Sequence, residues 1–214
     1  MTRLGCLGCF SILAFTAVVV LVLIGGLALS GNIFDLPSAP RREFSPEDGR
    51  RFQEKLAEIM LRGSNVSPRK EPIVISQREL NAFLQRHLME SERIRFSHML
   101  VHFSKGSIEI QGQTELRSLL NGFPFSLFGE YLPTSTTNRP VWMTIKGGVK
   151  VDRGHGEFLV EDFSLGRQSL SPWLFSWLFG GAGNRLMEWR VPASVEKITI
   201  EEGRAVITFS SKAA

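Results

Sequence analysis

The middle of the chain reads Val141-Trp142-Met143-Thr144-Ile145-Lys146-Gly147-Gly148-Val149-Lys150-Val151, and apolar and polar side chains alternate along most of it. A period of two places the apolar side chains on one face of a β-strand and the polar ones on the other. Residues 107–117 alternate in the same way. Three turn sequences separate such segments: Lys105-Gly106, Asp152-Arg153-Gly154 and Glu201-Glu202-Gly203. These patterns predict antiparallel strands with one buried and one solvated face.

The strands begin at about residue 93 and continue to the end of the chain. We expect them over residues 93–104, 107–117, 140–151, 157–166 and in a C-terminal hairpin over 195–210, with a short earlier strand over 73–75. One face of this sheet is apolar throughout, so it needs a cover.

A helix is predicted over residues 46–62. Ser45-Pro46-Glu47-Asp48 supplies an N-cap, a proline in the first turn and acidic residues at the positive end of the helix dipole. Its apolar positions are expected on one face: Phe52, Leu56, Ile59 and Met60.

A second helix is predicted over residues 77–89. Ser76-Gln77-Arg78-Glu79 is a capping box that marks its start. Its apolar stripe comprises Leu80, Phe83, Leu84 and Leu88.

Two aromatic segments are candidates for covering the sheet or binding an apolar ligand. Residues 172–187 are expected to form a helix that is apolar on every side near its start, at Trp173, Phe175, Trp177 and Phe179. Such a helix is either buried or in contact with lipid. Residues 119–132 form the second segment, which contains Phe123, Phe125 and Phe128. It is interpreted either as a covering loop or as the rim of a hydrophobic groove.

Residues 4–29 form an uninterrupted apolar run, and no charged side chain occurs between Arg3 and Asp35. About 20 apolar residues in a helix cross the hydrocarbon core of a bilayer. The run is longer than the apolar region of a secretory signal, although Ala28-Leu29-Ser30 leaves cleavage open as the alternative. The predicted organisation is therefore a transmembrane anchor over 1–31, a linker over 32–44 and one α+β domain over 45–214.

The anchor and the cysteines suggest where the domain lies. Both cysteines, Cys6 and Cys9, fall in the apolar run, so the domain itself has none. This usage fits a bacterial envelope compartment. We expect a single-pass protein with a cytoplasmic N-terminus and an extracytoplasmic domain, on the periplasmic side of the inner membrane if the cell is Gram-negative.

Charge and motifs exclude several classes of function. The net charge is +4, and basic residues are interleaved with acidic ones, so the sequence does not indicate nucleic-acid binding. His98 and His102 share a strand face but lack further ligands nearby, and no metal or cofactor is expected. No nucleophile elbow or phosphate loop is present in the sequence. The sequence therefore predicts a protein that is not an enzyme.

The order of elements resembles a known class of protein. The helix start Ile75-Ser76-Gln77-Arg78-Glu79-Leu80-Asn81-Ala82-Phe83-Leu84 and the ending from Val191-Pro192 to Ile207 resemble membrane-anchored bacterial envelope proteins of unknown function with a tubular lipid-binding (TULIP-like) domain. The likeness covers about residues 70–210. It implies a curved antiparallel sheet wrapped around a helix, with a lipid-like ligand between them. It brings no catalytic residues.

Two functions remain as expectations. The first is binding or shielding of a lipid-like ligand beside the bilayer, through Phe123, Phe125, Phe128, Trp173, Phe175, Trp177 and Phe179. The alternative is a scaffold subunit that docks an envelope protein and holds no ligand.

Overall fold

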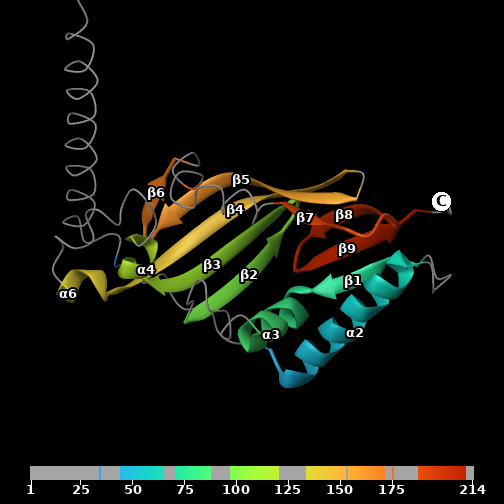
Figure 1. Ribbon diagram of the computed structural model, residues 1–214, viewed down its shortest axis with the longest axis horizontal. Helices are drawn as coiled ribbons and strands as arrows, with labels where there is room; N and C mark the ends of the chain where they lie inside the picture. The colour runs from blue at the N-terminus through green and yellow to red at the C-terminus, as the bar shows by residue number, and fades with distance from the viewer. Residues whose placement is uncertain are drawn as a thin grey trace, which may run out of the picture.

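The computed structural model describes residues 34, 44–64, 71–87, 97–120, 134–152, 154–171, 175 and 188–210. In these residues, antiparallel strands form two sheets that are accompanied by helices (Figure 1). The predicted α+β class is confirmed. The sequence predicted one sheet, whereas the described strands divide between a six-stranded and a three-stranded sheet.

Helix α2 spans Pro46–Gly63, as the sequence predicted to within one residue. The backbone N–H of Asp48 donates to Ser45 Oγ at 3.3 Å, and the Ser45 N–H donates to Asp48 Oδ2 at 2.8 Å. This reciprocal pair satisfies donors that the first turn of a helix otherwise leaves unpaired.

One residue of the expected apolar face of α2 points elsewhere. Phe52 and Ile59 are buried, but Met60 is 62% exposed. Met60 follows Ile59 directly, so it lies roughly 100° further round the helix. The prediction that it shares the buried face is wrong.

Strand β1 (Ile73–Ser76) leads directly into helix α3 (Gln77–His87). The predicted capping box is present, because the Ser76 N–H donates to Glu79 Oε2 at 2.8 Å and the Glu79 N–H donates to Ser76 Oγ at 3.3 Å. Leu80, Phe83 and Leu84 are partly buried against the core. Leu88 lies outside the described residues.

The larger sheet has the strand order β2-β3-β4-β5-β6, with β7 paired to β5. Its strands are β2 (His98–Ser104), β3 (Ser107–Glu115), β4 (Pro140–Asp152), β5 (His155–Leu165), β6 (Gln168–Leu170) and β7 (Glu188–Arg190). Two short helices, α4 (Leu116–Leu120) and α6 (Thr134–Thr137), lie between β3 and β4 along the chain. The sequence predicted the four long strands but not β6, β7 or the short helices.

The two faces of this sheet differ as the alternation predicted. One face packs around Phe163, which is fully buried, together with Met143, Ile145 and Phe158. On the other face, His102, Glu109, Lys146 and Asp162 are successive cross-strand partners. The opposite charges of the neighbours Glu109, Lys146 and Asp162 favour this register. Trp142 also belongs to the second face, but it is only 5% exposed, which the sequence did not predict.

The smaller sheet has the order β1-β9-β8, with β8 spanning Val195–Glu201 and β9 spanning Arg204–Phe209. The predicted C-terminal hairpin is thus present as β8 and β9. The earlier strand β1 pairs with β9 and completes the sheet. Helix α2 packs on this sheet through Phe52 and Ile59. Near the end of α2, a Cβ on Gly63 would lie 2.6 Å from Pro192 Cβ, so the absent side chain leaves room for this proline.

Two hairpin turns join the sheets. The Gly106 N–H donates to the Ile200 carbonyl and the Gly203 N–H donates to the Phe103 carbonyl, each at 3.0 Å. Phe103 and Ile200 also share a buried cluster with Val101 and Ala205. The two sheets therefore share both backbone hydrogen bonds and a core.

Some predicted segments lie outside the described residues. These are the anchor over 1–31, most of the linker over 32–44, and the helix over 172–187 except Phe175. In the part of the chain that the structure describes, no helix has the length and apolar character required to span a membrane.

Candidate functional site

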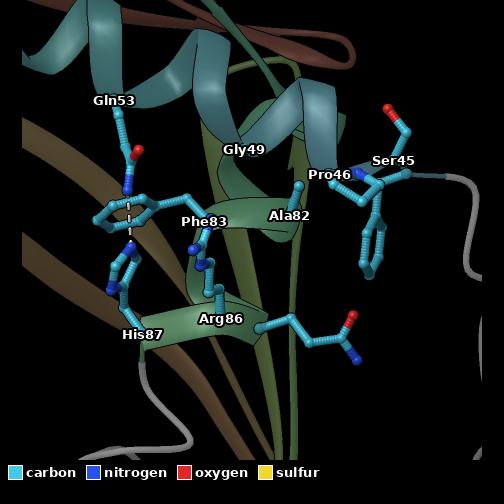
Figure 2. Close-up of a pocket in the computed structure, with 10 residues that line it drawn as sticks. Ser45, Pro46, Gly49, Gln53, Ala82, Phe83, Arg86 and His87 are labelled. Atoms are coloured by element: carbon cyan, nitrogen blue, oxygen red, sulfur yellow. Dashed lines mark hydrogen bonds between the residues drawn. The ribbon is translucent and has the colours of Figure 1, made fainter.

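A groove of about 230 Å³ lies between the start of α2 and the second half of α3 (Figure 2). Its floor is apolar and contains Phe44, Pro46, Ala82 and Phe83. The polar residues at its edge are Gln53, Gln85, Arg86 and His87. An apolar floor with a few polar groups at the edge is the usual character of a ligand site.

Gly49 creates space at the floor of the groove. It is a helical residue without a side chain, and a Cβ there would lie 3.5 Å from the backbone carbonyl carbon of Ala82. Glycine lowers helix stability by about 1 kcal/mol relative to alanine. A glycine in the first turns of a capped helix is therefore the sequence signal that accompanies this groove.

An aromatic stack that includes Phe83 joins the two helices beside the groove. The Phe83 ring lies 4.6 Å from the Phe52 ring and 4.5 Å from the His87 ring, measured between centroids. Gln53 Nε2 lies 2.8 Å from His87 Nε2, and Figure 2 shows this bond across the groove. His87 at the end of α3 therefore has a hydrogen-bond partner on α2. The bond fixes the imidazole against α2.

The positive end of α2 is already neutralised. The Ser45 backbone N–H lowers the pKa of the Asp48 carboxyl by hydrogen bonding to its charged form, and the Ser45 hydroxyl and the Arg78 charge act in the same direction. Arg78 Nη2 lies 3.6 Å from Asp48 Oδ2. The helix end therefore offers little attraction for an anionic ligand. Attraction for such a ligand has to come from a cation elsewhere in the groove.

Arg86 supplies that positive charge. Its side chain is exposed at the edge of the groove, and it forms no ion pair with another described residue. A guanidinium can donate two parallel hydrogen bonds to a carboxylate or a phosphate. The groove therefore combines an apolar floor with a cation suited to anionic groups.

A partly buried ion pair between α2 and α3 has a structural role. Lys55 Nζ lies 2.7 Å from Glu79 Oε1 and 2.8 Å from Glu79 Oε2, and it also donates to the Val74 carbonyl at 2.6 Å. Burial alone raises the pKa of Glu79, but the bonds from Lys55 and from the Ser76 N–H outweigh burial and lower it. A charged, fully bonded carboxylate ties α2, β1 and α3 together.

Of the ligand residues predicted from the sequence, Phe175 is the one that the structure describes, and it does not line this groove. Phe175 is 3% exposed, and its ring meets that of Phe163 edge to face at 5.5 Å, so it belongs to the core of the large sheet. The other predicted residues lie outside the described residues: Phe123, Phe125, Phe128, Trp173, Trp177 and Phe179.

The strand histidines do not form a metal site with other described residues. His98 Nδ1 lies 2.9 Å from Gln113 Oε1, and His102 is the cross-strand partner of Glu109. Among the residues that were placed, no group of three or more His, Cys, Asp or Glu side chains is arranged to hold a metal ion.

Comparisons with known protein families, with curated proteins and with solved structures found no match. The resemblance to TULIP-like envelope proteins therefore stays a prediction.

Proposed function

We propose that this chain is a single-pass, membrane-anchored, non-catalytic protein whose extracytoplasmic domain binds part of a lipid-like amphiphile. The observation that carries the proposal is the groove between α2 and α3, where Phe83 and Ala82 line an apolar floor beside the Arg86 guanidinium. The apolar run over residues 4–29 supports the anchor. It would hold the groove near a bilayer, where amphiphiles are abundant.

The size of the groove limits what it can hold. Sites for whole drug-sized ligands are typically about 300–1,000 Å³, whereas this groove measures about 230 Å³. It therefore suits one segment of an amphiphile, with the first methylenes on Phe83 and an anionic head at Arg86. Each buried methylene contributes about 0.8 kcal/mol.

A photo-cross-linking experiment tests this function. The full chain would be placed in lipid nanodiscs with a diazirine-bearing fatty acid, and the labelled peptides would be identified by mass spectrometry. We expect labelling of peptides from α2 and α3. Gly49→Leu, which places a side chain in the groove, should abolish that labelling. Ala57→Leu is the matched control, because residue 57 is exposed on the same helix outside the groove. Equal labelling of the two variants would refute the site.

A scaffold function is the second candidate. Met60 is 62% exposed and Leu61 is 49% exposed, and both are on α2. Exposed neighbouring apolar side chains are typical of surfaces that a protein partner covers. Chemical cross-linking in native membranes separates the two functions. A stoichiometric protein adduct that Met60→Lys removes, with no fatty-acid labelling of the groove, would favour the scaffold.

A further inference from the structure

One residue of the linker has a defined position on the domain. The ring of Phe34 lies 4.0 Å from the guanidinium carbon of Arg139, which is a cation–π contact. Arg139 directly precedes β4 and follows α6. Phe34 therefore contacts the domain at the start of β4.

The length of chain before this contact limits its distance from the apolar run. Leu29 is the last residue of that run, and Phe34 is five residues later. An extended chain covers at most about 3.3–3.6 Å per residue, so Phe34 lies within roughly 20 Å of Leu29. Arg139 must lie nearly as close to the end of the run.

Two short helices form the end of the sheet that carries Arg139. The Leu116 N–H at the start of α4 donates to the Arg139 carbonyl at 3.2 Å, and α6 is in contact with α4. Figure 1 shows α4 and α6 at one end of the six-stranded sheet and β8 and β9 at the other. Strand β3 runs from the far turn at Lys105 to the start of α4, and its length puts that turn about 25 Å from α4.

The exposed side chains of this end suit lipid headgroups. Arg117 and Arg139 are exposed, as are the hydroxyl residues Ser118, Thr134 and Ser135. Glu115 is the exposed acidic residue among those described at this end, in α4, α6 and the strand ends beside them. Basic residues near a surface of anionic lipids are attracted to it, and hydroxyls donate hydrogen bonds to phosphate oxygens.

We propose that the α4/α6 end is the surface of the domain that docks on the headgroup layer of anionic lipid, in the bilayer that holds residues 4–29. The inference rests on the proposed anchor and adds the orientation of the domain. The six-stranded sheet then extends away from the bilayer, with the turn at Lys105 distant from it.

Depth-dependent fluorescence quenching tests the orientation. The full chain, in a Cys6→Ser and Cys9→Ser background, would carry a fluorophore on Ser118→Cys in α4 or on Lys105→Cys in the far turn. Vesicles of phosphatidylcholine and phosphatidylglycerol would contain a lipid with a nitroxide on its headgroup. We expect strong quenching at position 118 and background quenching at position 105. Equal quenching, or stronger quenching at 105, would overturn the orientation.

Charge variants test the role of anionic lipid. Arg117→Gln should lower the ratio of docked to undocked domains about fivefold on phosphatidylglycerol vesicles and should have little effect on pure phosphatidylcholine. Arg190→Gln on β7 is the control, because Arg190 is exposed and pairs with the far end of β5. Equal effects of the two variants would contradict docking through Arg117.

Flotation of the same samples separates this inference from the proposed function. If the chain floats with the vesicles but position 118 is not quenched, the docking surface is wrong and the anchor stands. If the chain does not float, the anchor and the orientation both fail.

Discussion

The side-chain amide of Asn81 pairs with both backbone groups of Val101. The Val101 N–H donates to Asn81 Oδ1 at 2.6 Å, and Asn81 Nδ2 donates to the Val101 carbonyl at 2.8 Å. Gln77 accepts from the Phe103 N–H at 2.9 Å in the same way. Val101 and Phe103 lie on β2, the edge strand of the large sheet. Side chains of α3 thus occupy the place of a neighbouring strand and close an edge that would otherwise pair with another chain.

Replacing Asn81 should destabilise the domain. Asn81→Leu would leave a buried N–H and a buried C=O of Val101 unpaired, and each such group costs about 1–3 kcal/mol. We expect the free energy of unfolding to fall by about 2–4 kcal/mol, measured by urea denaturation with tryptophan fluorescence. Asn138→Leu is the control, because Asn138 is exposed. A fall of similar size at both positions would contradict the edge-closing role.

The Lys55–Glu79 pair should make stability depend on pH. Because the pKa of Glu79 is lowered on folding from its usual 4.5, the folded state binds fewer protons than the unfolded state near that pH. The stabilisation by the charged Glu79 carboxylate is fully present above pH 4.5. It is lost as the pH falls through the lowered pKa of Glu79. Glu79→Gln should cost about 2 kcal/mol at neutral pH, and the difference from the native chain should shrink in acid.

The control for that pH profile is Glu54→Gln. Glu54 pairs with Arg50 on the exposed surface of α2, where an ion pair contributes about 0–1 kcal/mol. The unfolding free energy of the Glu54→Gln variant should follow the pH profile of the native chain closely. A Glu79→Gln difference that stayed constant from neutral pH to acid would show that the charge of Glu79 does not stabilise the fold.

Adjacent glycines in β4 should differ in their response to the same substitution. A Cβ on Gly147 would overlap the Leu159 carbonyl oxygen and lie 2.8 Å from its carbon, whereas a Cβ on Gly148 has its nearest neighbours at 3.7 Å. Gly147→Ala should therefore destabilise the domain by about 3 kcal/mol, while Gly148→Ala should change stability by less than about 0.5 kcal/mol. Thermal unfolding of both variants by circular dichroism checks this, and equal melting temperatures would be inconsistent with the close approach of Gly147 to Leu159.

Gly49→Ala should raise stability and weaken amphiphile binding together. The added Cβ makes ordinary contact with Ala82 and removes a helical glycine, so the gain is about 1 kcal/mol. The comparison is Gly63→Ala, where the added Cβ would overlap Pro192 and should lower the melting temperature. Calorimetry and fatty-acid titration of the two variants measure both effects. Unchanged binding by Gly49→Ala would argue against a ligand on the groove floor.

Local patterns in the sequence predicted the local elements well. Alternation over residues 107–117 and 140–151 located β3 and β4, and the capping sequences at Ser45 and Ser76 located the starts of α2 and α3. Each of these signals lies within a few residues of the element that it marks. The structure therefore confirms them.

Features that depend on distant partners were not predictable in this way. Glu79 and Asn81 are each more deeply buried than the neighbouring Leu80, because their partners Lys55 and Val101 come from other elements. The division into two sheets has the same cause, since alternation does not reveal which strands pair. The groove depends on the close approach of Gly49 in α2 to Ala82 in α3. Only the packing of the two helices reveals that approach.

The joined turns of the two sheets govern when this domain can fold. Phe103 bonds to Gly203, and β1 near the start of the domain pairs with β9 near its end. Most of the domain sequence lies between β1 and β9. Contacts between residues so far apart in sequence make folding slow. During synthesis the chain grows from its N-terminus, so β1 lacks its partner until the final strand emerges. Completion of the domain thus waits for the synthesis of β9, and a truncation before β9 leaves β1 and β8 with no strand between them.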